Sequence, residues 1–117
     1  MSQIVHERID GVPVARPRAD VDAANARQVR DELAACLGGA EKLVLDLSET
    51  RYVDSVGIDM LFRLGELLRE RRAALVLVIP HSSQLTRLAQ IVALPSAFPV
   101  HETVEQALGA CSQRTGA

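Results

Sequence analysis

Two side chains suited to chemistry, Asp54 and Ser55, stand together in the middle of the chain. They follow a short apolar run and precede a segment whose apolar residues recur at helical spacing. A serine hydroxyl here can act as a nucleophile if a base lies nearby, and either side chain can cap the helix. Gly57, in the first predicted turn, lets another backbone or a ligand approach closely. We therefore place the candidate functional site at this junction.

The pattern around Ser55 does not favour catalysis. The nucleophile-elbow motif G-x-S-x-G is absent, because Val53 stands two residues before Ser55. His6, His81 and His101 are scattered without metal-ligand spacing, and the chain has neither a P-loop nor a GxGxxG motif. We expect no enzymatic activity, no metal and no cofactor. A hydrolase that uses His81, which follows a predicted strand end, is the minor alternative.

The elements that position the junction follow from apolar periodicity. Continuous apolar runs at 43–47 and 75–79 have the length and branching of strands buried on both faces. Asp46 within the first run is expected to hydrogen-bond loop amides. Between the runs, a helix is predicted from about Gly57 to Arg72. Its inward face carries Ile58, Leu61, Phe62, Leu64, Gly65 and Leu68.

The chain begins with a hairpin signal. Residues 4–9 and 12–16 flank Asp10-Gly11, and both turn positions tolerate positive φ. Pro13 and Pro17 each remove a ladder donor, which is typical of strands that lie at a sheet edge or end there. A further short extended piece is expected at 98–100, in a loop that Pro95 and Pro99 bracket.

Three more helices are predicted from caps and apolar stripes. Their candidate N-caps are Asp22 or Asn25, Ser82 or Ser83, and Thr103, which forms a capping box with Gln106. Strands that alternate with helices after a hairpin predict a single α/β domain over residues 1–117. The expected architecture is a mixed central sheet with parallel inner strands and about four helices. Partners of such sheets gather beyond the strands' carboxyl ends, where the 48–57 loop leaves.

Composition excludes several classes of protein. The chain has 117 residues, of which 48% are hydrophobic and 24% charged, which suits one domain with a real core. No apolar run approaches the roughly 18–20 residues of a membrane span, and the first residues contain no signal-peptide core, so we expect a cytoplasmic protein. A net charge of -2 with interspersed signs indicates no nucleic-acid partner. Arg69, Arg71 and Arg72 are interpreted as complementing a helix dipole.

The two cysteines have no CxxC or Cys/His spacing. Cys36 and Cys111 each fall on the apolar stripe of a predicted helix. We predict two buried, reduced thiols, with a redox-linked disulfide as the alternative.

The run LVLDLSETRYVDSVGIDMLFRL, together with ALPSAF and HETVEQAL, resembles the STAS domain family, and within it the bacterial anti-sigma factor antagonists. The resemblance extends from the hairpin to Leu108. Its most specific part is a strand-Asp-Leu-Ser … Val-Asp-Ser-x-Gly pattern. This pattern is carried by Asp46, Leu47, Ser48, Val53, Asp54, Ser55 and Gly57.

The resemblance implies a partner switch in transcription regulation and stress response. Ser55 would be phosphorylated by an anti-sigma factor with serine kinase activity, and a protein phosphatase would reverse this. The unmodified protein would bind the anti-sigma factor and so release a sigma factor. The implied partner-binding residues are Asp22, Asp54, Ser55, Val56, Gly57 and Ile58. The alternative within the family is a free-standing STAS subunit of a lipid-transport ABC complex or of a stress-signalling assembly.

Local structure alone offers a second interpretation of these residues. Asp22, Asp54 and Ser55 could serve only as helix caps, and Gly57 as a packing or turn glycine. The chain also departs from the family pattern. Residues 19–22 read Ala-Asp-Val-Asp where Gly-Glu-Leu-Asp is usual, Val56 replaces a frequent second hydroxyl residue, and Ala93 replaces a loop glycine.

Overall fold

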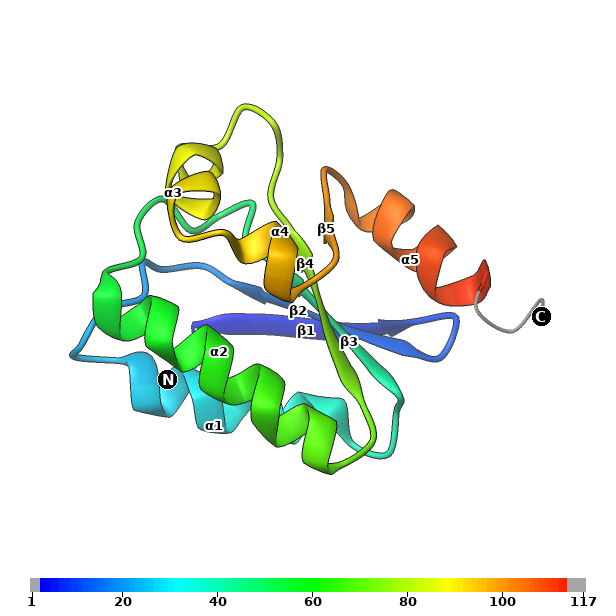
Figure 1. The fold of residues 1–117 in the computed structure, drawn as a ribbon. Coiled ribbons are helices and arrows are strands. Elements are labelled where there is room, and N and C mark those ends of the chain that lie inside the picture. Colours follow the sequence, from blue (N-terminus) through cyan, green and yellow to red (C-terminus); the bar gives the residue numbers. More distant parts are fainter. Residues whose placement is uncertain (1–2, 114–117) are drawn as a thin grey trace.

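The computed structural model describes residues 3–113, and its sheet begins with the predicted hairpin. The five strands lie in the order β1-β2-β3-β4-β5. Strand β1 pairs with β2 antiparallel, and the remaining pairs are parallel (Figure 1). The bounds are β1 Ile4–Ile9, β2 Val12–Pro17, β3 Lys42–Asp46, β4 Ala74–Val78 and β5 Val100–His101. The mixed sheet with parallel inner strands is therefore confirmed.

The hairpin turn has the predicted chemistry, because Asp10 and Gly11 have φ of 52° and 81°. Of the two hairpin strands only β1 lies at an edge of the sheet, however, since β2 also pairs with β3. That parallel ladder is confined to Val14 and Ala15, between the two prolines of β2. The missing donors of the prolines thus limit the length of the ladder, although the strand lies inside the sheet.

Five helices accompany the sheet in the described part of the chain. They are α1 Ala26–Leu37, α2 Ser55–Glu70, α3 Leu85–Ile91, α4 Leu94–Ala97 and α5 Val104–Gln113. Helix α4 was expected to be a loop. It forms because Pro95 occupies its first turn, where a fixed φ suits a helix and no amide is needed. Ala93, in the left-handed conformation with φ 57°, turns the chain into it.

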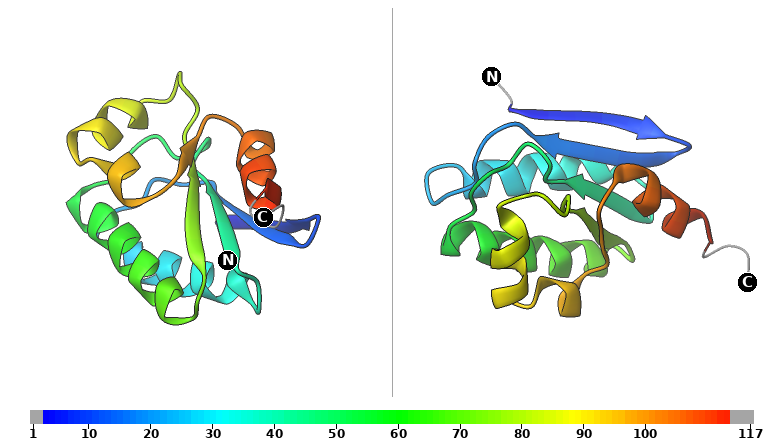
Figure 2. Two further views of the ribbon diagram at one scale, coloured as in Figure 1. Left: turned by 45° about the vertical axis from the view of Figure 1, so that its right-hand side comes forward. Right: turned by 90° about the horizontal axis from the view of Figure 1, so that it is seen from above.

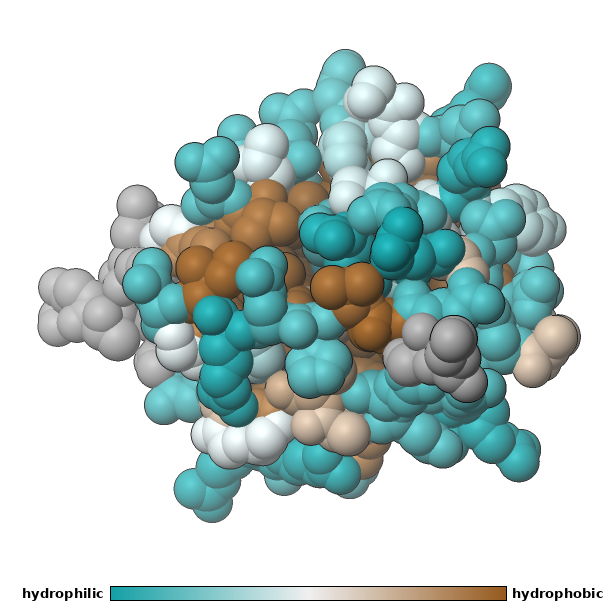
Figure 3. All heavy atoms as spheres, turned by 180° about the vertical axis from the view of Figure 1, so that it is seen from behind, coloured by the Kyte–Doolittle hydropathy of each residue, from teal (hydrophilic) through white to brown (hydrophobic). Residues whose placement is uncertain are grey.

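The alternation of side chains along β3 and β4 divides the interior into two cores. Leu43, Leu45, Leu75 and Leu77 belong to the larger core, which α1 to α4 cover. Val44, Val76 and Val78 face the other way, toward Ala107 and Cys111 of α5. Figure 2 shows α5 alone on one side of the sheet and the other helices opposite. The outer surface seen in Figure 3 is mostly hydrophilic, with small hydrophobic patches in between.

Three predicted caps have mixed outcomes. Neither candidate side chain caps α1, since the Asp22 carboxylate accepts the amide of Ala24 and the Asn25 side-chain oxygen accepts the amide of Asp22, both at 2.9 Å. These bonds fix the preceding turn instead. The Ser83 hydroxyl accepts the amide of Leu85 at 3.0 Å, but the N-cap position of α3 is the next residue, Gln84, whose side chain makes no capping bond.

The capping box before α5 forms with one variation. The Thr103 hydroxyl accepts the Gln106 amide at 3.0 Å, and the Gln106 side chain accepts the Glu102 amide at 3.1 Å. The reciprocal bond thus reaches one residue further back than in the usual box.

The cysteines lie against different cores. Cys111 of α5 is buried in the smaller core, whereas Cys36 of α1 packs against the larger core and is only half buried, contrary to the prediction. Because the sheet separates them, they do not form a disulfide with one another within the chain. Burial raises the pKa of the Cys36 thiol, and the negative charge of Glu32 adds to the shift.

No helix in residues 3–113 combines the length and apolarity needed to cross a membrane.

Candidate functional site

The site begins where β3 ends. Asp46 is buried, with 5% of its surface exposed, and its carboxylate accepts the amide of Ser48 at 2.9 Å. This bond explains an acidic residue at the end of a buried strand, as predicted. It turns the chain out of the sheet into the loop that leads to α2.

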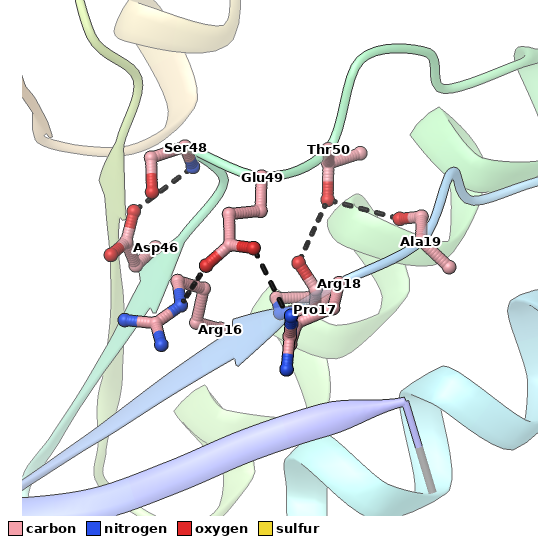
Figure 4. A network of polar contacts seen from close by, with 8 residues as sticks. All are labelled: Arg16, Pro17, Arg18, Ala19, Asp46, Ser48, Glu49 and Thr50. Carbon is pink, nitrogen blue, oxygen red and sulfur yellow. Dashed lines mark hydrogen bonds and ion pairs between the residues drawn. The ribbon is translucent and has the colours of Figure 1, made fainter.

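The loop is then attached to the end of β2 (Figure 4). The Glu49 carboxylate lies 2.7 Å from Arg16 Nε and 3.4 Å from Arg18 Nε. The buried Thr50 hydroxyl donates to the carbonyl of Ala19 at 3.1 Å. The ion pairs are partly exposed and each stabilises the fold by at most about 1 kcal/mol. Their main effect is to hold the course of the loop.

Residues 19–22 run beside residues 51–54, although about thirty positions separate them. Val21 donates its amide to the carbonyl of Tyr52 at 3.0 Å and accepts the amide of Asp54 at 3.1 Å. The Asp20 carboxylate accepts the amides of Arg51 and Tyr52 at 3.0 and 3.1 Å. The segment that departs from the family pattern therefore still lies directly against the Asp54-Ser55 junction.

Asp54 is the N-cap of α2. One carboxylate oxygen accepts the amide of Gly57 at 2.8 Å, and the other accepts the amide of Ala23 at 3.1 Å. One side chain thus satisfies a helix amide and also ties the 19–24 segment to α2. The helix begins at Ser55, two residues earlier than predicted.

Ser55 is the first helical residue and not the cap, so the interpretation of this serine as the N-cap is wrong. Its side chain is exposed, and its hydroxyl has no hydrogen-bond partner among residues 3–113. The amides of Ser55 and Val56 are likewise without partners in this part of the chain, as is usual at N1 and N2. A hydroxyl and two open donors therefore share one exposed turn.

Gly57 serves close packing. A Cβ atom there would lie 2.5 Å from Cγ1 of Val53 and 2.9 Å from the carbonyl oxygen of Val21. The residue is buried, so it shapes the site from beneath. The packing interpretation of this glycine is confirmed.

A depression of about 480 Å³ opens between the start of α2 and α3, and we call it the α2–α3 groove. It is lined by Arg51, Tyr52, Val53, Asp54, Ser55, Ile58, Gln84, Leu85, Leu88 and Val92. Apolar side chains predominate, and Tyr52 is 57% exposed at its rim. Ser55 thus borders a surface that an apolar partner side chain could fill.

Only some of the predicted partner-binding residues line the α2–α3 groove. Ser55, half-buried Asp54 and half-buried Ile58 line the α2–α3 groove, while Val56 is 44% exposed on the opposite flank of the helix. Asp22 is half buried, with its carboxylate engaged by Ala24. Their role in partner binding stays a prediction.

Sequence reasoning missed the residues that complete the groove. Tyr52 had a signal, because it is an aromatic residue in an otherwise polar loop. Leu88 and Val92 lie at helical spacing, which indicates only the apolar face of a helix. No histidine lines the groove. His81 is 89% exposed and lies 3.4 Å from Glu102, and residues 3–113 contain no group of acidic, histidine or cysteine side chains suited to a metal.

This sheet, its helices and the exposed serine after the N-cap define a STAS domain. The family model for the STAS domain matches residues 3–107, and the chain belongs to this family. It is 31% identical over 111 residues to BtrV of Bordetella bronchiseptica, which is named as a candidate anti-sigma factor antagonist, covering 92% of this chain and 93% of BtrV.

Solved structures agree with this assignment. An anti-sigma factor antagonist from Mycobacterium paratuberculosis has a TM-score of 0.75 and 27% identity, covering 92% of this chain and 91% of that one. The unphosphorylated form of the anti-sigma factor antagonist SpoIIAA has a TM-score of 0.66 and 15% identity, covering 97% and 99%. The phosphorylated form of Bacillus SpoIIAA has the same TM-score at 16% identity, covering 92% and 98%. At these identities the SpoIIAA structures support the fold alone.

Proposed function

We propose that the protein is an anti-sigma factor antagonist whose binding surface is the start of α2 with the α2–α3 groove. Its partner is an anti-sigma factor with serine kinase activity, and binding displaces a sigma factor. Phosphorylation of Ser55 ends the complex, and a protein phosphatase restores it. The observation that carries the proposal is the exposed, unpartnered Ser55 hydroxyl at the rim of an apolar groove. We further propose that it acts in the cytoplasm and has no catalytic activity of its own.

The position of Ser55 suits a charge switch. A phosphate adds about −1.5 to −2 charges and three acceptor oxygens. At N1 the open amides of Ser55 and Val56 and the positive end of the helix dipole favour this charge, so the domain itself tolerates it. The cost falls on the complex, because an apolar or acidic partner surface would have to bury the phosphate.

The surrounding contacts explain how Ser55 is presented. The Asp54 carboxylate uses both oxygens within the domain, at 2.8 Å to Gly57 and 3.1 Å to Ala23. No bond joins this carboxylate to the hydroxyl of Ser55, which is an exposed residue. A kinase would meet the hydroxyl in an ordered turn and not in a flexible loop.

Phosphate transfer tests the site assignment directly. Incubated with its cognate kinase and ATP, the wild-type protein is expected to gain one phosphate, measured by intact-mass spectrometry. Ser55→Ala should gain none, while the matched controls Ser48→Ala and Ser83→Ala should behave as wild type. A phosphate on any serine other than Ser55 would contradict the assignment.

Binding tests the mechanism. Ser55→Glu should lower affinity for the anti-sigma factor about a hundredfold, because an unpaired carboxylate in a desolvated interface costs a few kcal/mol. Ser55→Ala should bind nearly as well as wild type. If Ser55→Ala lost binding while Ser55→Glu kept it, the hydroxyl would be a contact and the charge switch would be wrong. Capture of a permease–ATPase complex from native cells, without a kinase, would refute the partner assignment.

A further inference from the structure

A second depression lies on the other flank of the α2 N-terminus, between α1 and α2. It has a volume of about 320 Å³, and we call it the α1–α2 hollow. Its lining consists of Ala23, Ala26, Arg27, Arg30, Val56, Asp59, Met60 and Arg63. The contributing positions of α2 recur every three or four residues, so they form one helix stripe. Ser55 and Ile58 lie on the other stripe, facing the α2–α3 groove.

The hollow carries an excess of positive charge. Arg63 is paired with Asp59 at 2.6 Å, and Arg30 with Asp31 at 3.1 Å. Arg27 makes no ion pair or hydrogen bond to any residue within 3–113. Glu66 also acts on Arg63, and Asp54 accepts the amide of Ala23, so the carboxylates gather around the other arginines and leave Arg27 as the guanidinium of the lining without a paired carboxylate.

The fold does not account for Arg27. It is exposed and lies in the first turn of α1, which contains no acidic residue. A cation there opposes the helix dipole and so disfavours the helix. Beside it are the small side chains Ala23 and Ala26, which leave the guanidinium room to receive another group.

We propose that the α1–α2 hollow receives an acidic side chain of the partner protein, an aspartate or glutamate, with Arg27 as its principal contact. The inference rests on the proposed function, since the same partner would cover both flanks of the α2 N-terminus. Val56, 44% exposed at the rim, supplies the apolar contact between them. Guanidinium and carboxylate match in geometry as well as charge, which favours this ligand.

The hollow also gives phosphorylation a second effect. Ser55 directly precedes Val56, so a phosphate there places about −1.5 to −2 charges beside the surface that carries the unpaired Arg27. This negative charge opposes the attraction between Arg27 and an acidic partner segment. Because the arginines are exposed, the effect is expected mainly in the association rate and its salt dependence.

A defined probe tests the hollow without the partner. A short blocked polyglutamate peptide is titrated at low salt into isotope-labelled protein, and amide chemical shifts are followed by NMR. We expect the amides of Ala23, Arg27 and Val56 to shift and the shifts to vanish in high salt. Arg27→Gln should abolish these shifts. The control Arg87→Gln removes the same charge from an exposed position of α3 and should not abolish them.

Three results would overturn the inference: no shifts at these amides, shifts that Arg27→Gln leaves unchanged, or shifts centred on other arginines. An oligothymidylate of equal charge that shifts the same amides at lower concentration would assign the hollow to nucleic acid instead. With the anti-sigma factor itself, Arg27→Glu should slow association about tenfold at low salt, and Arg87→Glu should not. If the wild-type protein bound no anti-sigma factor, the proposed function would be refuted. If it bound and Arg27→Glu left the association rate unchanged, only the proposed role of the α1–α2 hollow would be refuted.

Discussion

Gly57→Ala adds one methyl group at the point where α2 crosses the 19–22 segment. The new Cβ would lie 2.5 Å from Cγ1 of Val53 and 2.9 Å from the carbonyl oxygen of Val21. The valine side chain could rotate, but the carbonyl is backbone and accepts the Asp54 amide at 3.1 Å. Relief of the contact therefore requires the helix start and the 19–22 segment to move apart.

Two opposing terms set the magnitude. Alanine in place of glycine within a helix stabilises a protein by about 0.5–1 kcal/mol. An extra methyl in a packed region costs about 1–3 kcal/mol, and more where backbone must shift. The sum predicts that Gly57→Ala lowers the free energy of unfolding by about 1–2 kcal/mol.

Urea unfolding followed by circular dichroism measures this change, and the chain offers a matched control. Gly109 lies in α5, and a Cβ there would meet no atom within 4 Å. Gly109→Ala should therefore raise the free energy of unfolding by about 0.5–1 kcal/mol, the helix-propensity term alone. The same substitution is expected to have opposite signs at the two sites. If Gly57→Ala stabilised the protein as Gly109→Ala does, the close approach of Val21 would not restrain α2.

Two further substitutions and the labelling of both cysteines test other parts of the structure. Asp54→Ala removes both bonds of the α2 cap and should lower the free energy of unfolding in urea by about 1–3 kcal/mol, while an unchanged value would refute the cap. Ala93 has a left-handed φ of 57°, which glycine adopts without strain. Ala93→Gly should therefore raise the free energy of unfolding, measured by calorimetry, by about 0.5–1 kcal/mol. A lower free energy of unfolding would show that Ala93 is not strained. In the native protein a thiol reagent should label Cys36 more slowly at neutral pH than a free cysteine, because its raised pKa lowers the thiolate fraction, and the rate should rise at alkaline pH. Cys111 should react only after denaturation, and rapid native labelling would contradict its burial.

Much of the fold was predictable because its signals are local. The apolar runs at 43–47 and 75–79 correspond to β3 and β4 with a shift of one residue, and Asp10-Gly11 forms the expected turn. Helix α4 was missed, since four residues give no periodicity, and Pro95 within it and Pro99 after it indicated a loop. The predicted side-chain cap of α1 was wrong, because the side chains of Asp22 and Asn25 accept amides of the turn before the helix and not amides of the helix. Several amides are within reach of each side chain, and the sequence does not tell which one it binds.

The candidate site was predictable in position but not in detail. Asp54 and Ser55 are both good caps, so composition could not separate the cap from the free hydroxyl. The separation comes from the Ala23 amide, 31 positions away, which draws the Asp54 carboxylate into the cap position. The α2–α3 groove could not be predicted either, because it depends on where α3 lies beside α2, and the order of the strands in the sheet decides that position.

The sequence by itself determined the elements, the family and the junction at which Asp54 and Ser55 stand, because periodicity, turn chemistry and motif spacing act within a few residues. Tertiary structure alone decided which side chain caps α2, that Gly57 packs against Val21, and that three arginines of two helices share a hollow. Those facts depend on backbone segments about thirty residues apart that the sheet brings into contact. The physical reason is that packing distances and shared charges arise only between elements, after each element has already formed.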